Sequence, residues 1–237
     1  LKTIVGFSNA ENTYKNDRYY DYQTPSENKL RFMDTDNAEN RIAVSTLFNS
    51  KINKKTTLRA GLLFENYTLD SKISSRDRQE DNDGDGYSDL VELVTQNGNY
   101  NIVQPFVQGQ FRLTEKLTFN AGVHGQYFSI NDEFVFEPRT ALSYAFNPKN
   151  TVCFGYGLHH QTVPAPILFL NEFVDGVQVQ TNKDLDLVQS QHYVLGYDVR
   201  LANKWRGKVE VYYQDIKKAG VESFPSSYST LTEGADF

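Results

Sequence analysis

The sequence predicts an all-β protein: an antiparallel up-and-down transmembrane β-barrel, of which about nine strands are present. Three observations support this prediction. Apolar residues alternate with polar or small residues, tight polar turns alternate with wide connections, and 14% of the residues are aromatic, almost all Tyr and Phe. Such residues favour strands.

The alternation is clearest in TVCFGYGLHH, residues 151–160, where Val152, Phe154 and Tyr156 occupy every second position. Successive strand residues point to opposite faces, so these side chains share one face and Cys153 and His159 share the other. The same period recurs in residues 42–48, 58–64, 117–123, 193–201 and 209–213. A soluble β-sandwich also produces such alternation, so this pattern alone leaves both architectures open.

The connections favour the barrel. Short polar turns occur at residues 52–56, 114–116, 147–150 and 202–205, and longer connections at 11–36, 74–98, 130–134 and 161–186. Outer-membrane barrels have short periplasmic turns and long extracellular loops. We expect strands of roughly ten to fifteen residues, longer than the strands of most globular proteins.

The bulk properties narrow the class of protein. No apolar run approaches the roughly 18 residues of a transmembrane helix, and a net charge of −6 argues against a nucleic-acid partner. The single Cys153 cannot form an internal disulfide. The chain begins in a strand pattern without an initiator Met or signal peptide, and a nine-strand sheet in lipid leaves unpaired edges. We therefore expect residues 1–237 to be a partial barrel, with strands missing on both flanks.

Two segments resemble the barrel of TonB-dependent receptors, particularly those of Bacteroidetes-type bacteria. Residues 136–161 read FEPRTALSYAFNPKNTVCFGYGLHHQ, in which a strand beginning with EPR leads through an NPK turn into a strand rich in Gly and aromatics. Residues 182–205, NKDLDLVQSQHYVLGYDVRLANKW, resemble the next hairpin of that family. The first half of the chain resembles the family only in its general style of strands and loops.

This resemblance implies an outer-membrane barrel of roughly 22 strands in the complete protein. It also implies an N-terminal plug, absent from this chain, that couples to the TonB complex. The imported ligand would be scarce: a metal chelate, a cobalamin-like cofactor or an oligosaccharide. The expected partners are outer-membrane lipid, the TonB complex and a surface lipoprotein.

The sharpest motif is DNDGDGYSDLVE, in the expected extracellular loop 74–98. It matches the calcium-loop pattern, with acidic residues at the first, third, fifth, ninth and twelfth positions. A hard cation such as Ca²⁺ takes six to eight oxygen ligands, and Gly86 permits the sharp turn. The alternative is a solvated acidic loop. The spacing favours a structural Ca²⁺ site formed by Asp81, Asp83, Asp85, Tyr87, Asp89 and Glu92.

Other polar residues predict less specific roles. Glu137 with Arg139, and Asp198 with Arg200, lie opposite the large apolar groups, where lumen solvation or a weak exposed ion pair is favoured over contact with a plug or ligand. Adjacent residues His159 and His160 point to opposite faces and should not converge on one metal ion. With His124 and His192 they predict a polar lining. The apolar stretch at residues 164–170, PAPILFL, is expected to pack on its own barrel.

Three functions remain open. The first is energy-coupled import through a plugged barrel, with loops 74–98 and 161–186 helping to capture the ligand. The second is a binding or adhesin barrel without transport. The third is a secreted calcium-binding β-domain, which requires a second sheet over the apolar face. No nucleophile, phosphate-binding or zinc-protease motif indicates an enzyme.

Overall fold

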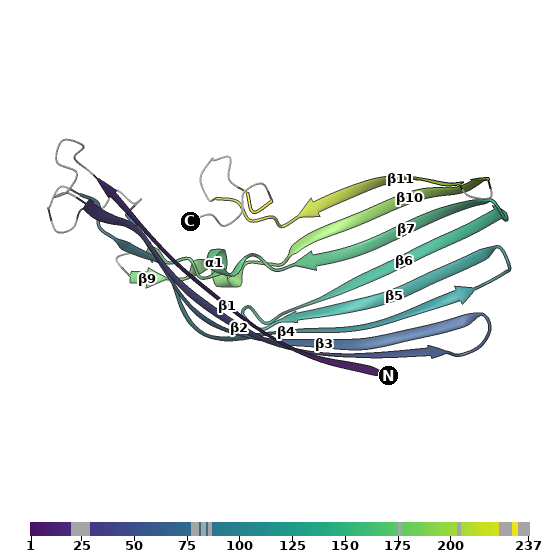
Figure 1. Ribbon diagram of the computed structural model, residues 1–237, viewed down its shortest axis with the longest axis horizontal. Coiled ribbons are helices and arrows are strands. Elements are labelled where there is room, and N and C mark those ends of the chain that lie inside the picture. The colour runs from purple at the N-terminus through teal and green to yellow at the C-terminus, as the bar shows by residue number, and fades with distance from the viewer. Residues whose placement is uncertain are drawn as a thin grey trace.

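The computed structural model describes residues 1–19, 29–76, 81, 84, 87–174, 177–202, 205–222 and 229–231. Figure 1 shows one curved sheet of long strands. Nine strands follow one another in the order β1-β2-β3-β4-β5-β6-β7-β10-β11, and each is antiparallel to the next. Their bounds are β1 Lys2–Tyr19, β2 Lys29–Lys51, β3 Thr56–Ser75, β4 Val91–Arg112, β5 Leu117–Phe128, β6 Glu133–Asn147, β7 Asn150–Gln161, β10 Val188–Ala202 and β11 Trp205–Lys217.

The up-and-down order confirms the predicted fold class, and the tight turns lie where the sequence places them. They gather at one end of the sheet, at the right of Figure 1. Side-chain oxygens close three of these turns: Asn53 Oδ1 accepts the Lys55 N–H at 2.8 Å, Thr114 Oγ1 accepts the Leu117 N–H at 3.0 Å, and Asn147 Oδ1 accepts the Lys149 N–H at 2.9 Å. Short Asn and Thr side chains favour such turns because they bond to nearby backbone.

The predicted length of ten to fifteen residues is confirmed for β5, β6, β7, β10 and β11, whereas β1 to β4 are longer and the prediction of wide connections is partly wrong. Strands β1 to β4 contain 18, 23, 20 and 22 residues. Much of segment 11–36 is therefore strand, with Glu11 paired to Ala38, and β4 already includes residues 91–98 of the expected loop. The connection at 130–134 is a tight turn over residues 129–132, with Asp132 at φ 54°. Polar residues continue a strand beyond the membrane because the ladder is formed by backbone groups.

One face of the sheet is covered by exposed apolar side chains, and we call it the outer face. Leu142 pairs with Phe154, Phe154 with Leu195, and Leu195 with Val211, so one apolar row crosses four strands. Their side chains are exposed: Phe154 by 48%, Leu195 by 55% and Val211 by 67%. A band of this kind is expected where strands face lipid. It confirms the faces predicted from the alternation.

Among the described residues, no helix combines the length and apolar character needed to cross a membrane.

Candidate functional site

The opposite face, which we call the inner face, is polar and rich in glycine. The sheet curves around the connection between β7 and β10, which lies over this face in Figure 1. Inner-face side chains alternate with the apolar band, so the strand register places them in rows. One row of paired residues crosses six strands in the order Arg59, Gln108, Gly122, Arg139, Gly157 and His192.

The connection between β7 and β10 is a folded element rather than an open loop. It contains α1 (Ala165–Leu168), β8 (Glu172–Val174), β9 (Val177–Val179) and the 3-10 helix η1 (Thr181–Asp184). Ile167, Leu168 and Phe169 are buried, with exposures of 7%, 2% and 3%. The expectation that PAPILFL packs on its own barrel is therefore confirmed.

Two apolar clusters attach this connection to the inner face, at the end of the sheet opposite the tight turns. The first joins Ile167 and Leu168 to Phe128 of β5 and to Leu187. The second joins Phe169 to Leu69, Ile73 and Val94 of β3 and β4. Burial of apolar surface stabilises such contacts by about 25 cal/mol per Å², so the connection and the strands form one packed unit.

Amide side chains add polar tethers to the start of β4. Gln180 Nε2 donates to Thr95 O at 2.9 Å and to Phe169 O at 3.1 Å. Asn171 Nδ2 donates to Glu92 O at 3.2 Å, and the Asn171 backbone N–H donates to Leu93 O at 2.7 Å. The predicted loops 74–98 and 161–186 therefore contact each other directly.

A groove of about 240 Å³ remains between the folded connection and the inner face of β1 to β4. Its floor contains Leu69, Ser71 and Val94, which are at most 7% exposed. Phe169 and Pro166 line it from the connection, and residues of β1 and β2 complete it: Ala10, Glu11, Asn12, Asn37, Ala38 and Glu39. The groove therefore combines apolar walls with a small number of polar groups.

Among the residues that the structure describes, Glu137 of β6 is the most enclosed charged group on this face, with an exposure of 2%. Its Oε2 atom lies 2.8 Å from His124 Nδ1 and accepts a hydrogen bond from Arg139 Nη2 at 2.8 Å. Its Oε1 atom accepts the backbone N–H of His160 at 2.5 Å. The expectation of a solvated lumen residue or a weak exposed pair is therefore wrong for Glu137. Backbone pairing of β6 with β7 ends at Arg139 and Gly157, and beyond this point the Glu137 carboxylate accepts the His160 N–H.

Asp198 and Arg200, the other predicted pair, do not bond to each other. Asp198 instead binds Arg206 of β11, at 2.8 Å between Oδ1 and Nε, while Arg206 is 69% exposed. The expected pairing of Asp198 with Arg200 is therefore replaced by an ion pair between neighbouring strands, in which the Asp198 side chain is 17% exposed.

The two adjacent histidines, His159 and His160, contact different side chains. The His159 ring meets the His192 ring edge to face, with centroids 4.9 Å apart, whereas His160 Nδ1 lies 3.4 Å from Glu137 Oε1. Within the described part of the chain, no three His, Cys, Asp or Glu side chains form a group that could hold a metal ion.

A wider depression of about 620 Å³ lies beside Glu137. Gly122 forms part of it, and a Cβ atom there would come within 2.8 Å of Gln108 Cβ and 2.9 Å of Val107 O. The polar lining includes Arg59, His124 and Arg139. This surface bears basic and imidazole groups, whereas the excess acid of the chain lies in residues 77–92.

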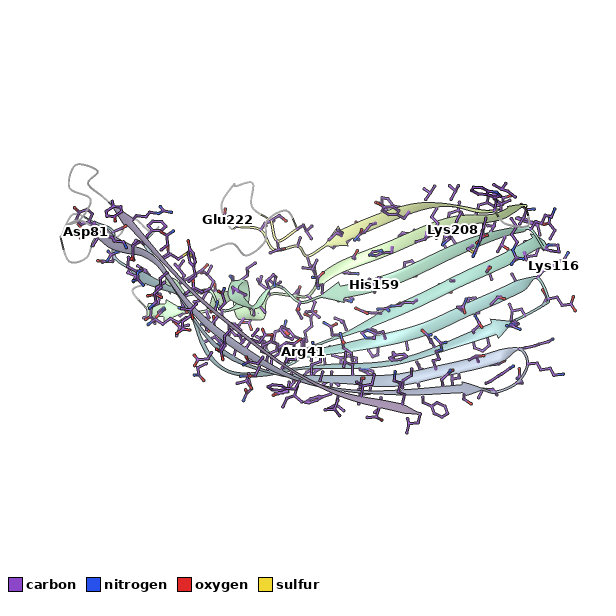
Figure 2. The ribbon with its side chains drawn as sticks, viewed as in Figure 1. Arg41, Asp81, Lys116, His159, Lys208 and Glu222 are labelled. Carbon is purple, nitrogen blue, oxygen red and sulfur yellow. The ribbon has the colours of Figure 1, made fainter. Side chains whose placement is uncertain are left out.

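The acidic motif is only partly within the described residues, because Asp83, Asp85 and Gly86 lie outside them. Asp81 Oδ1 accepts the Gly84 N–H at 2.7 Å, and Gly84 has a φ of +76°. Tyr87 and Asp89 precede β4, and Glu92 is its second residue. Asp81 lies at the end of the sheet opposite Lys116 and the tight turns (Figure 2).

Glu92 has partners of its own. It forms an ion pair with Lys72 and accepts a hydrogen bond from Thr95 Oγ1 at 3.1 Å. Glu92 lies at the end of β4 that is remote from the tight turns, and this strand of 22 residues is longer than the roughly ten that cross a bilayer. Glu92 is therefore outside the membrane-spanning part of the strand. The hydrogen bond from the Lys72 ammonium lowers the pKa of the Glu92 carboxyl below its ordinary value. The Ca²⁺ site remains a prediction.

Sequence reasoning missed Gln180, Asn171 and Glu39. The two amides occur in a polar connection, where Asn and Gln are common, and their partners on β4 are more than seventy residues away in the sequence. Glu39 lies in a segment that we assigned to a connection rather than to β2. Its position on the inner face follows from the register of β2, which begins at Lys29 and pairs Glu39 with Leu69.

Comparison with known proteins identifies the architecture. The chain matches the family model described as TonB dependent receptor-like, beta-barrel, over residues 2–232. A search of curated protein sequences found no match.

Several solved structures are similar to this chain. A variant of the ferric enterobactin receptor of Pseudomonas aeruginosa, in complex with enterobactin, superposes with a TM-score of 0.61 and 14% identity, covering 93% of this chain and 33% of that one. The siderophore receptor PirA of Acinetobacter baumannii gives 0.61 and 13%, with coverages of 93% and 33%. The copper transporter OprC gives 0.61 and 11%, with coverages of 90% and 35%.

The chain thus spans about a third of the length of these structures. At such low identity they show a shared fold, and the family model carries the assignment. The chain belongs to the β-barrel family of TonB-dependent receptors and lies in the outer membrane.

Proposed function

We propose that this chain is part of the wall of an energy-coupled outer-membrane importer. The importer takes up a scarce ligand, such as a metal chelate, a cofactor or an oligosaccharide, and leaves it chemically unchanged. A plug inside the complete barrel connects the receptor to the TonB complex, and a surface lipoprotein is a further partner. The family match over residues 2–232 carries this proposal.

The two faces of the sheet support it. The outer face presents apolar side chains suited to lipid, whereas the inner face presents Arg, His, Gln and Glu. Strands β1 and β11 form the two edges of the nine-stranded sheet. Unpaired edges are costly in a bilayer, so further strands are expected to complete the barrel.

The folded connection between β7 and β10 supports a role in ligand capture. It lies over the inner face at the end opposite the tight turns, which is the extracellular end of an outer-membrane barrel. A ligand entering the barrel from outside would meet this element and the groove beneath it. We further propose that Ca²⁺ orders the neighbouring loop through Asp81, Asp83, Asp85, Tyr87, Asp89 and Glu92.

The alternatives are less well supported. A secreted β-domain needs a second layer over its apolar face, and the described residues place no such layer on the outer face. Three of the similar structures are a ferric enterobactin receptor, a siderophore receptor and a copper transporter. These names favour transport over adhesion for the complete protein.

The experiment is energy-dependent uptake by cells that produce the complete receptor. Cells with a functional TonB complex should accumulate radiolabelled candidate chelates, cobalamin or oligosaccharides, and isogenic cells without TonB should not. Equal accumulation in both strains, or surface binding without accumulation in either, would refute import and leave a non-transporting barrel.

A further inference from the structure

The groove between the folded connection and β1 to β4 has the properties of a small-molecule subsite. Ligand sites are concave and mostly apolar, with a small number of polar groups that fix orientation. Here the apolar part comes from Leu69, Val94 and Phe169, which are each at most 7% exposed. At about 240 Å³ it is smaller than the roughly 300 Å³ at which pockets for complete drug-sized ligands begin. It therefore suits one ring of a larger molecule.

The walls are held in place from both sides. Val94 forms a β-bridge with Leu170, and Gln180 ties Thr95 to Phe169. On the opposite side, Ser71 Oγ donates to Asn37 Oδ1 at 2.5 Å, joining β3 to β2. The groove is consequently built by packed residues from distant parts of the sequence, which makes it a preformed cavity.

The groove is acidic, and Glu39 is its carboxylate on the inner face. Among the described residues, Glu39 has neither a hydrogen-bond partner nor an ion-pair partner, although it lies on the inner face in register with Leu69. Arg41, two residues further along the same face, already pairs with Glu65. Lys183 sits 5.4 Å from the Phe169 ring centroid but does not line the groove. The lining of the groove therefore includes two carboxylates, Glu39 and its neighbour across the strand pair, Glu11 of β1, and no basic residue. Of these two, Glu39 lies on the inner face, in register with Leu69.

We propose that this groove binds an apolar ring bearing a positively charged group, with the ring against Phe169 and Leu69 and the cation at Glu39. This inference rests on the proposed function in that the apolar ring and its cation are taken to be part of the ligand that the receptor captures. The subsite itself depends only on the groove and its charge.

The test uses the complete receptor, purified in detergent, and three probes that share one ring. Tryptamine carries an ammonium group, indole carries no charge and indole-3-acetate carries a carboxylate. Isothermal titration calorimetry, corrected with protein-free micelles, should give affinity in the order tryptamine, indole, indole-3-acetate. Equal affinities, or the strongest binding for indole-3-acetate, would overturn the assignment of a cationic ligand.

Two variants locate the binding. E39Q should reduce the affinity for tryptamine about fivefold, which is the upper range for a partly exposed ion pair, and should leave indole unchanged. A10L fills the groove without changing charge and should abolish binding of all three probes. The matched control is D70N, which removes one carboxylate next to Leu69 on the outer face and should leave every affinity unchanged.

The outcomes separate this inference from the proposed import. Heat-dependent mobility in SDS gels establishes that each variant remains folded. If A10L binds the probes as the native receptor does, they bind elsewhere and the subsite is refuted, whatever the uptake assay shows. If the probes bind as expected while TonB-dependent uptake is absent, the subsite stands and import is refuted.

Discussion

Removal of the Glu137 carboxylate is expected to weaken the wall at the point where β6 and β7 separate. In E137A, the His160 N–H and the His124 ring lose their acceptor in a nearly closed environment, since His160 and His124 side chains are only 10% and 18% exposed. Arg139 is 47% exposed, so water replaces its bond at little cost. An unsatisfied buried donor costs about 1 to 3 kcal/mol. We therefore expect E137A to lose about 3 kcal/mol of unfolding free energy.

The assay is urea unfolding of the complete receptor in micelles, with the free energy taken from the midpoint and the slope. E137Q keeps an oxygen acceptor for the His160 N–H and should lie between E137A and the native protein. The control is E210A on β11, where Glu210 forms an ion pair with Lys208 and both side chains are about half exposed; it should lose less than about 1 kcal/mol. If E137A and E210A unfold at the same urea concentration, the carboxylate does not hold this seam.

Three further predictions concern the loop and the glycine row. G122A should lose about 1 to 3 kcal/mol through overpacking, whereas G155A on the internal strand β7, whose added Cβ meets Val194 Cβ at 3.9 Å, should lose less in the same unfolding assay; equal losses would refute the close approach at Gly122. About 1 mM Ca²⁺ should slow proteolysis of residues 77–90, since a site with a dissociation constant near 0.1 mM gains about 1.4 kcal/mol; protection that persists in D81N, or is absent in native protein, would refute the Ca²⁺ site. In Ca²⁺-free buffer, the Lys72–Glu92 pair lowers the folded pKa of Glu92, so its stabilisation is complete above the unfolded pKa and is lost as pH falls through the folded value. Proteolysis at this loop should therefore accelerate on acidification in native protein, and E92Q, lacking the titrating group, should show a flatter pH profile; parallel profiles would contradict the role of the pair.

Local patterns predicted much of the fold because each needs only neighbouring residues. The alternation around Phe154 and Leu195 defines which side chains share a face, and this follows from the two-residue period of a strand. The tight turns at Asn53, Thr114 and Asn147 follow from side chains that bond within three residues. The strand ends were predicted less well, because polar residues beyond the bilayer carry no apolar period while their backbone ladder continues.

The contacts that build the candidate site depended on register between distant segments. The sequence places Glu137 and Arg139 on one face, but pairing of β6 with both β5 and β7 decides that His124 and the His160 N–H meet the same carboxylate. Local reasoning therefore assigned an enclosed group to open solvent.

The amino-acid sequence by itself determined the two faces of the sheet, the tight turns at one rim and the family, since these depend on short periods and local motifs. The sequence also predicted that PAPILFL packs on its own barrel. Only the tertiary structure decided that this segment lies on the inner face, that Gln180 tethers it to Thr95 and that a groove remains beside Glu39. Those contacts join segments separated by dozens of residues. Their formation depends on packing and strand register, which no local pattern encodes.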